Sequence, residues 1–237
     1  MRMVGANLRN RATAFTATEL CVVIVLLALL AVGVIYFVAM GPRQHSHPYS
    51  PGMHCARNLK QIGLAYRVFA NDNDDKFPAL VTNSLAFGNV TQTWLHFQSM
   101  SNELGSAKVL VCPVDRERTP NIMSDFGAGP FATRLSLSTL SNAAVSYFAS
   151  LDADETTPNV ILSGDRHLNT NHINLNGQLF LANSSLPAAT FTTNQHDGAG
   201  NIGLSDGSVQ QVTSRGLAQQ IDRQGSVTNR LLLPLLP

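Results

Sequence analysis

Several polar residues near the C-terminus are of the types from which a catalytic site could be built. His196, Asp197 and Asp206 could supply a base and the group that orients it, and Ser205 or Ser208 could serve as a nucleophile. A catalytic triad is placed by the fold, however, and closeness in sequence does not assemble one. We therefore expect a protein that is not an enzyme, in which His196 hydrogen-bonds a C-terminal hairpin or Asp206 and fixes the fold.

An acidic segment in the first third of the chain has the chemistry of a calcium site. Asp72, Asp74 and Asp75 offer hard oxygen ligands within four residues. The segment lacks the glycine and the closing glutamate of an EF-hand loop, so a solvated turn that ends a helix is the alternative. No other cofactor is expected, because three histidines elsewhere in the chain follow no zinc-ligand spacing: His96, His167 and His172.

The charge of the chain is low and nearly balanced. Only 13% of the 237 residues are charged and the formal net charge is +1. This balance gives no basic surface for nucleic acid, so no nucleic-acid partner is expected. An apolar content of 44% excludes a disordered chain.

One apolar run is long enough to cross a bilayer. Residues 20–40 contain no charge, and as a helix they would reach about 32 Å at 1.5 Å per residue. Arg2, Arg9 and Arg11 precede the run, which puts the N-terminus in the cytoplasm and exports the rest. A signal peptide is the alternative, but its apolar region is about 7–15 residues long. We predict a single-pass inner-membrane protein whose C-terminal domain is periplasmic or extracellular.

The exported region then contains two of the three cysteines. Cys55 and Cys112 lie where disulfides form and persist, while Cys21 lies in the apolar run. We predict a Cys55–Cys112 disulfide, with two free buried thiols as the alternative.

The elements of the exported region indicate an α+β fold. Residues 41–52 hold three prolines and two glycines and are predicted to be a linker. After it, apolar residues recur at helical spacing and predict an amphipathic helix over 53–70 that packs on an antiparallel sheet. Its predicted buried face is Cys55, Leu59, Ile62, Tyr66 and Phe69.

Short apolar runs predict the strands of that sheet. Residues 202–205 and 208–212 are predicted to form a hairpin, joined by Asp206 and Gly207 in a type I′ turn. A short helix is expected over 217–223, and the tail 231–237 is expected to pack on the surface. The other predicted strands are 109–111, 145–148, 160–162 and 178–181.

Glu19 stands at the start of the apolar run, where a carboxylate is costly and usually has a partner. With Ala14 and the segment F-T-A-T-E-L from Phe15 to Leu20, the N-terminus resembles the prepilins of type IV pili and the pseudopilins of type II secretion systems. The resemblance implies that a prepilin peptidase cleaves between Ala14 and Phe15, and that the new amine is methylated. It also implies that Glu19 pairs with the Phe15 ammonium of a neighbouring subunit during assembly.

Further segments resemble the large prepilin-like families of planctomycetes and verrucomicrobia. Residues 55–72 with 76–78 resemble the start of their exported domain, and 108–115 resemble their Cys-Pro-x-Asp element. His196, Asp206 and Gly207 match their C-terminal motif of a histidine, nine residues and Asp-Gly.

The resemblance implies a pilin-like chain with four parts. They are a basic leader at 1–14, a membrane and assembly helix at 15–40, the linker at 41–52 and a pilin-like domain at 53–237. The implied function is that of a structural subunit of a pilus or pseudopilus, with other pilin subunits and an inner-membrane assembly platform as partners. The alternative is a membrane-anchored module that binds a glycan, a peptide or a secreted substrate.

Overall fold

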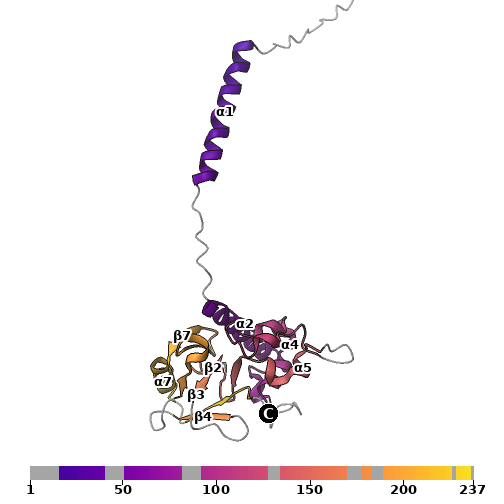
Figure 1. The fold of residues 1–237 in the computed structure, drawn as a ribbon, viewed down its shortest axis with the longest axis vertical. Helices are drawn as coiled ribbons and strands as arrows, with labels where there is room; N and C mark the ends of the chain where they lie inside the picture. The colour runs from indigo at the N-terminus through magenta and orange to yellow at the C-terminus, as the bar shows by residue number, and fades with distance from the viewer. Residues whose placement is uncertain are drawn as a thin grey trace, which may run out of the picture. The chain divides into compact units, whose positions relative to one another are not determined.

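The computed structural model describes residues 16–40, 51–81, 92–127, 134–169, 178–182, 189–225 and 228–235. By its internal contacts the chain divides into two units, Met1–His47 and Pro48–Pro237 (Figure 1).

The first unit contains a single described helix, α1, at Ala17–Met40. Within it, Ala17–Phe37 is long and apolar enough to cross a membrane. The side chains described on α1 are exposed, and they include large apolar ones from Leu20 to Phe37. Nothing in its own unit therefore covers the apolar surface of α1 among the residues described.

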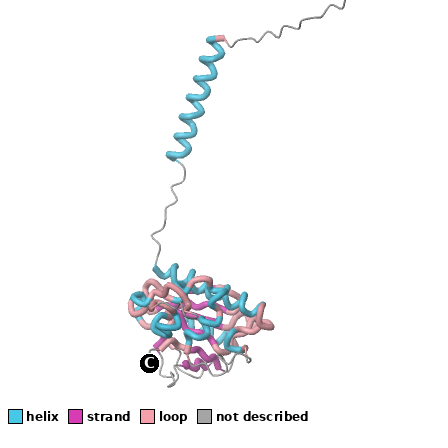
Figure 2. Tube along the Cα trace, turned by 90° about the vertical axis from the view of Figure 1, so that its right-hand side faces the viewer, coloured by secondary structure: helices cyan, strands magenta, loops and turns pink. Residues whose placement is uncertain are grey.

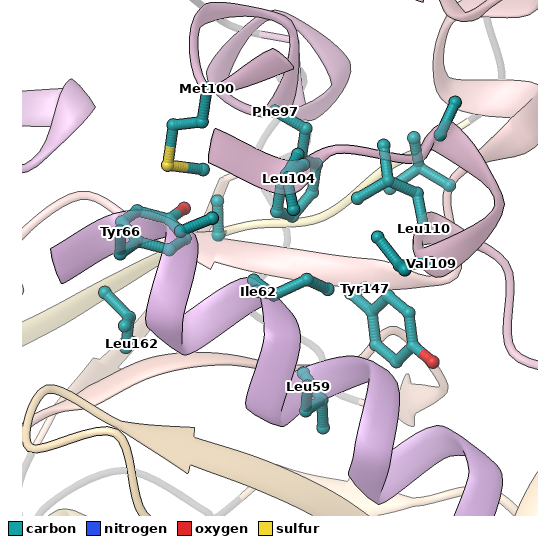
Figure 3. Packing of buried hydrophobic residues seen from close by; sticks show 14 of the residues in the cluster. Leu59, Ile62, Tyr66, Phe97, Met100, Leu104, Val109, Leu110, Tyr147 and Leu162 are labelled. Atoms are coloured by element: carbon teal, nitrogen blue, oxygen red, sulfur yellow. The ribbon is translucent and has the colours of Figure 1, made fainter. Parts of the chain in front are cut away.

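The second unit begins with α2 at Pro51–Asn71. Its predicted buried face is confirmed, because Cys55, Leu59, Ile62, Tyr66 and Phe69 are all buried. Figure 3 shows Leu59, Ile62 and Tyr66 packed near side chains of later elements, among them Phe97 and Tyr147.

The helix α2 starts before the predicted boundary. The linker predicted at 41–52 overlaps it at Pro51 and Gly52. Proline suits the first turn of a helix, because its missing N–H would be unpaired there and its φ is already helical. Two of the five residues that suggested a linker, Pro51 and Gly52, therefore belong to the first turn of α2.

An antiparallel sheet forms the centre of the second unit (Figure 2), which confirms the α+β prediction. Its six described strands run in the order β4-β8-β1-β2-β6-β7, and each neighbouring pair is antiparallel. The strands are β1 (Tyr147–Ser150), β2 (Ile161–Asp165), β4 (Gln178–Ala182), β6 (Ala199–Leu204), β7 (Val209–Thr213) and β8 (Thr228–Leu232), with β3 (Leu168–Asn169) and β5 (Thr190–Phe191) in a separate pair.

Both faces of the sheet are covered. Successive side chains of a strand point to opposite faces. Tyr147 of β1 and Leu162 of β2 accordingly join the core with α2, while Phe148 and Ile161 join a second core with Leu217 of α7 (Ser214–Arg223). Every residue of β1 and β2 is buried.

Short helices complete the domain. In Figure 1, α4 and α5 lie at one end of it, and α7 lies with β7 at the other. The short helical segments are η1 (Pro78–Leu80), α3 (Thr93–Ser99), α4 (Ser101–Leu104), η2 (Ala107–Leu110), η3 (Thr119–Asn121), α5 (Leu137–Leu140), η4 (Ser141–Ala144) and α6 (Thr193–His196).

Two predictions about apolar runs are wrong. Residues 109–111 are not a strand: Val109 and Leu110 belong to η2 and are buried there. The tail does not lie on the surface, because Leu231 and Leu232 belong to β8, between β4 and β1 in the sheet. Short apolar runs signal burial, but burial alone does not distinguish a strand from a helical turn.

The predicted hairpin is formed by β6 and β7, but its turn differs from the prediction. The amide of Gly207 donates to the Leu204 carbonyl at 2.9 Å, and the amide of Leu204 donates to the Ser208 carbonyl at 2.9 Å. Within this loop only Gly207 has a positive φ, of 80°. A type I′ turn needs a positive φ at Asp206 as well, so the connection is a three-residue loop with its left-handed residue at glycine.

Candidate functional site

The first turn of α1 satisfies the Glu19 carboxylate within its own helix. The backbone N–H and the hydroxyl of Thr16 both donate to Glu19 Oε2 at 2.9 Å. The amide of Glu19 lies 3.3 Å from Thr16 Oγ1 and donates to it. This reciprocal pair is a capping box, which satisfies two N–H groups that the start of a helix leaves unpaired.

Sequence reasoning missed this role of Glu19. The signal was present, because T-x-x-E directly before an apolar run is the sequence signature of a capping box. Ala14 and Phe15, the predicted cleavage site, lie outside the described residues, so the predicted pairing of Glu19 with Phe15 stays a prediction.

In the domain, Cys55 of α2 and Cys112 after η2 are joined by a disulfide. Their Cα atoms are 5.1 Å apart, and both residues are fully buried. Cys112 Sγ lies 3.8 Å from Nε2 of His196, the last residue of α6. The disulfide therefore links α2 and η2 next to the histidine of the C-terminal motif.

Asp165, the last residue of β2, connects this histidine to the hairpin. Its Oδ2 atom accepts hydrogen bonds from the backbone N–H of Asn201 at 2.7 Å and from Asn201 Nδ2 at 2.8 Å. His196 Nε2 lies 3.2 Å from the same oxygen and 3.3 Å from Asn201 Nδ2.

Burial, together with the negative charge of Asp165, raises the pKa of Tyr147 well above its usual value.

The residues that follow Asp165 bind a second buried carboxylate. Arg166 donates from Nε to Asp115 Oδ2 at 2.8 Å and from an Nη atom to Asp115 Oδ1 at 3.0 Å, and it also binds Glu117. His167 Nε2 lies 3.4 Å from Asp115 Oδ1. Burial of Asp115 by itself raises its pKa, but the hydrogen bonds from His167 and Arg166 and the charge of Arg166 hold the pKa well below its usual range.

These contacts bring three sequence motifs together. The Cys-Pro-x-Asp element supplies Cys112 and Asp115, the amphipathic helix supplies Cys55, and the C-terminal motif supplies His196. Asp165–His167 and Asn201 connect them. We call this set of residues the junction.

Sequence reasoning found the cysteines and His196 of the junction but missed Asp115, Asp165, Arg166 and Asn201 as its connecting residues. One signal was available, since Asp165, Arg166 and His167 form three consecutive titratable residues that begin three positions after the apolar run 160–162, in a chain poor in charge.

Asp206 and Gly207 contact α2, whereas the sequence analysis expected Asp206 to bind His196. The Asp206 carboxylate accepts from the Ser208 amide at 2.8 Å, and its carbonyl accepts from Arg67 of α2 at 3.5 Å. A Cβ placed on Gly63 of α2 would lie 3.6 Å from the Gly207 Cα, so the hairpin loop packs closely on α2. Of the two predicted partners of His196, the hairpin is contacted through Asn201, whereas Asp206 binds elsewhere.

The geometry does not favour nucleophilic catalysis at His196. In a triad, one ring nitrogen faces the nucleophile and the other faces the carboxylate. Here Cys112 Sγ and Asp165 Oδ2 both lie near Nε2, and the sulfur is held in the disulfide.

Ser205 is not placed as an exposed nucleophile either. The segment from Gly203 to Gly207 has the G-x-S-x-G spacing, which sequence reasoning overlooked. A nucleophile elbow requires a strand-to-helix turn with an exposed hydroxyl. Ser205 instead lies in the hairpin loop, is buried, and donates from Oγ to the Val160 carbonyl at 3.3 Å.

Two groups of metal-ligating atoms lie close together in the described part of the chain, both within the junction or beside it. Cys55, Cys112 and His196 form one group, with their ligand atoms within 4.8 Å of one another, but their sulfurs are bonded to each other. Asp115, Glu117 and His167 form the other, and Arg166 binds both of its carboxylates. In the second group, the positive charge that faces the two carboxylates is the guanidinium of Arg166.

The predicted calcium ligands lie in an exposed turn. Asp74 and Asp75 have positive φ values of 55° and 57°. Amides of Asp72 and Asp75 bind carbonyls of the last turn of α2, Phe69 and Ala70. In the part of the chain that the structure describes, Asp72, Asp74 and Asp75 do not form a group of ligand atoms like the two above.

We compared the chain with known families, curated proteins and solved structures. No family model matches the sequence, and neither a curated protein nor a solved structure matches it.

Proposed function

We propose that the protein is a structural subunit of a type IV pilus-like or type II secretion pseudopilus filament. In this proposal a prepilin peptidase removes residues 1–14, the new Phe15 amine is methylated, and α1 holds the subunit in the inner membrane. Packing of α1 helices then builds the filament and displays the pilin-like domain outside. Other subunits and an inner-membrane assembly platform are the partners.

The observation that carries the proposal is that α1 combines two features: its apolar side chains are exposed, and its first turn contains a carboxylate, Glu19. The large side chains of α1 from Leu20 to Phe37 are exposed, so α1 needs an apolar environment outside its own unit. A bilayer supplies one before assembly, and neighbouring helices supply one afterwards. In the low-dielectric surroundings of packed helices, Glu19 would attract the Phe15 ammonium of a neighbour and fix the axial stagger between subunits.

The junction supports the same proposal from the domain. A subunit of an exported filament must stay folded outside the cytoplasm, where cytoplasmic chaperones cannot refold it. The disulfide and the buried ion pair of Arg166 with Asp115 connect α2, the segment after η2 and the end of β2. The junction therefore stabilises the domain that the filament would display.

One observation favours the alternative of a membrane-anchored binding module. The capping box gives Glu19 a partner three residues away in its own helix. Glu19 would therefore stabilise the first turn of α1 in a simple membrane anchor as well, and the presence of this residue alone does not imply assembly.

Glu19→Gln separates the two functions. Glutamine at this position still completes a capping box, because it accepts the Thr16 N–H, but it carries no charge to attract an ammonium. If the protein is a filament subunit, E19Q abolishes filaments sheared from cells while the protein stays in the membrane fraction. Filaments at the wild-type level in E19Q would refute charge pairing, whereas a wild-type protein that forms no filaments would favour the membrane anchor.

Thr16→Ala is the matched control, because it weakens the capping box and leaves the charge of Glu19 in place. Assembly should survive in T16A if charge pairing dominates. Mass spectrometry of the membrane-extracted protein tests processing independently: the N-terminal peptide should begin with N-methylated Phe15, and an intact peptide spanning Ala14 and Phe15 would contradict cleavage there.

A further inference from the structure

The face of α2 that does not pack on the domain forms one continuous exposed stripe. At 100° per residue, its exposed residues fall within an arc of about 120°. Leu64 is 63% exposed, Met53 50% and Val68 40%. The stripe consists of Met53, Arg57, Lys60, Gln61, Leu64, Arg67 and Val68.

The charges of this stripe are all positive. No Asp or Glu occurs between Pro51 and Asn71, so α2 contributes only basic groups to its exposed face. Arg67 lies 3.4 Å from Glu155, an acidic group on the neighbouring surface, and the acidic turn 72–75 follows the helix. Two of the three basic residues of the stripe, Arg57 and Lys60, lie in the first half of α2.

That first half is also the part closest in sequence to α1. Only residues 41–50 separate Met40 from Pro51. Ten residues span at most about 35 Å when fully extended. If α1 lies in a bilayer, the start of α2 stays near the bilayer surface, at an effective concentration on the order of millimolar or higher.

We propose that the exposed stripe of α2 binds the anionic headgroups of the membrane that holds α1 while the subunit is unassembled. Basic and apolar residues on one helix face are the composition of helices that lie on membrane surfaces, with aliphatic stems of Lys and Arg along the boundary. A second copy of the chain is a less suitable occupant, because stable dimers bury about 800 Å² per partner and a single helix stripe is narrow. The inference rests on the membrane position of α1 proposed above.

Tryptophan quenching by brominated phospholipids tests this inference on the full chain in vesicles. Trp94 is the only tryptophan, so W94F provides the background. Leu64→Trp reports on the stripe, and Gln219→Trp, at an exposed position of α7, is the matched control. Tyr36→Trp reports whether α1 is in the bilayer. In vesicles with brominated phosphatidylglycerol, L64W should be quenched at least about twofold more than Q219W.

Charge dependence tests the nature of the contact. Lys60→Glu in the L64W background, or about 0.5 M NaCl, should remove most of the extra quenching, because headgroup attraction is screened by salt. Equal quenching in vesicles of neutral phosphatidylcholine would overturn the headgroup assignment.

The outcomes separate this inference from the proposed function. Quenching of Y36W without quenching of L64W refutes the lipid contact alone. No quenching of Y36W refutes the membrane position of α1, and the inference with it. A blue-shifted L64W emission without quenching shows that protein rather than lipid covers the stripe and also overturns the proposal.

Discussion

Glu19 in α1 and Asp115 in the junction are both carboxylates that lie beside apolar chain, but they are satisfied over very different distances in sequence. Glu19 receives its hydrogen bonds from Thr16, three residues away. Asp115 binds Arg166, which is 51 residues away. The first arrangement can form in an isolated helix, whereas the second requires that β2 and the segment after η2 are already in place.

The comparison predicts which part of the chain is destabilised when each kind of contact is removed. Loss of a local cap should affect the first turn of α1 and leave the domain intact. Loss of a long-range junction contact, such as Asp115–Arg166, Asp165–Asn201 or Cys55–Cys112, should destabilise the whole domain, because these contacts join segments far apart in the sequence.

Asp115→Asn should have the largest effect. It leaves the largely buried Arg166 guanidinium with only the exposed Glu117 as a charge partner, and removing the buried member of such a pair costs about 3–5 kcal/mol. The measurement is the free energy of unfolding of the full chain in detergent, by urea titration followed by near-UV circular dichroism. The matched control is Asp152→Asn: the Arg230–Asp152 pair is much more exposed and should contribute at most about 1 kcal/mol.

The pH dependence checks the same pair. The pKa of Asp115 is lowered by folding, so its contribution is present above the unfolded value of about 4 and is lost as the pH falls toward the folded value. The wild type should therefore lose stability below about pH 4 more steeply than D115N. Parallel pH profiles would contradict the role assigned to Asp115.

Removal of the disulfide should have the next largest effect. Replacing Cys55 and Cys112 together by serine opens a loop of 57 residues and should cost about 3–4 kcal/mol, because the unfolded chain gains freedom. Thiol alkylation of the denatured protein with mass spectrometry checks the bond first: without reductant, neither cysteine should react, whereas two free thiols would. Cys21→Ser is the control, since Cys21 lies on α1 and its loss should leave domain unfolding unchanged.

Asn201→Ala should have an intermediate effect. It removes the Nδ2 donor from buried Asp165 and keeps the backbone N–H, so the expected loss is about 1–3 kcal/mol. Gln211→Ala is the matched control, because Gln211 pairs with Asn201 across the hairpin but is exposed, and its loss should cost no more than about 0.5 kcal/mol. Equal costs would show that Asn201 acts as an ordinary strand residue.

Thr16→Ala should have the smallest effect on unfolding. The lost cap should destabilise the start of α1 by about 1 kcal/mol, which faster hydrogen exchange of the first-turn amides would reveal in micelles. Val22→Ala, on the same helix but with no side-chain hydrogen bond to the cap, is the control. A change in domain unfolding in T16A would contradict the division between local and long-range satisfaction.

Much of the fold follows from local patterns. The apolar run predicts α1, and helical spacing from Cys55 to Phe69 predicts α2 with its buried face. The run 178–181 predicts β4 with an error of one residue. These predictions succeed because periodicity reports directly which side of an element is buried.

The failures share a physical cause. Leu231 and Leu232 look like an apolar tail, but the strand order gives β8 a place inside the sheet. Val109 lies in a helical turn, although its run has the length of a strand. In both cases the sequence indicates burial, and the packing of distant segments decides the backbone that achieves it.

For this chain, the sequence by itself determined the features that depend on neighbours along the chain: an apolar helix, an amphipathic helix and the presence of a hairpin. Only the tertiary structure decided that Asp165 meets Asn201 and His196, and that Arg166 meets Asp115. A buried carboxylate must find its donors wherever the fold places them, because leaving it unpaired away from water is too costly. The positions of those donors are fixed by sheet register and by the disulfide, which spacing in a single sequence does not encode.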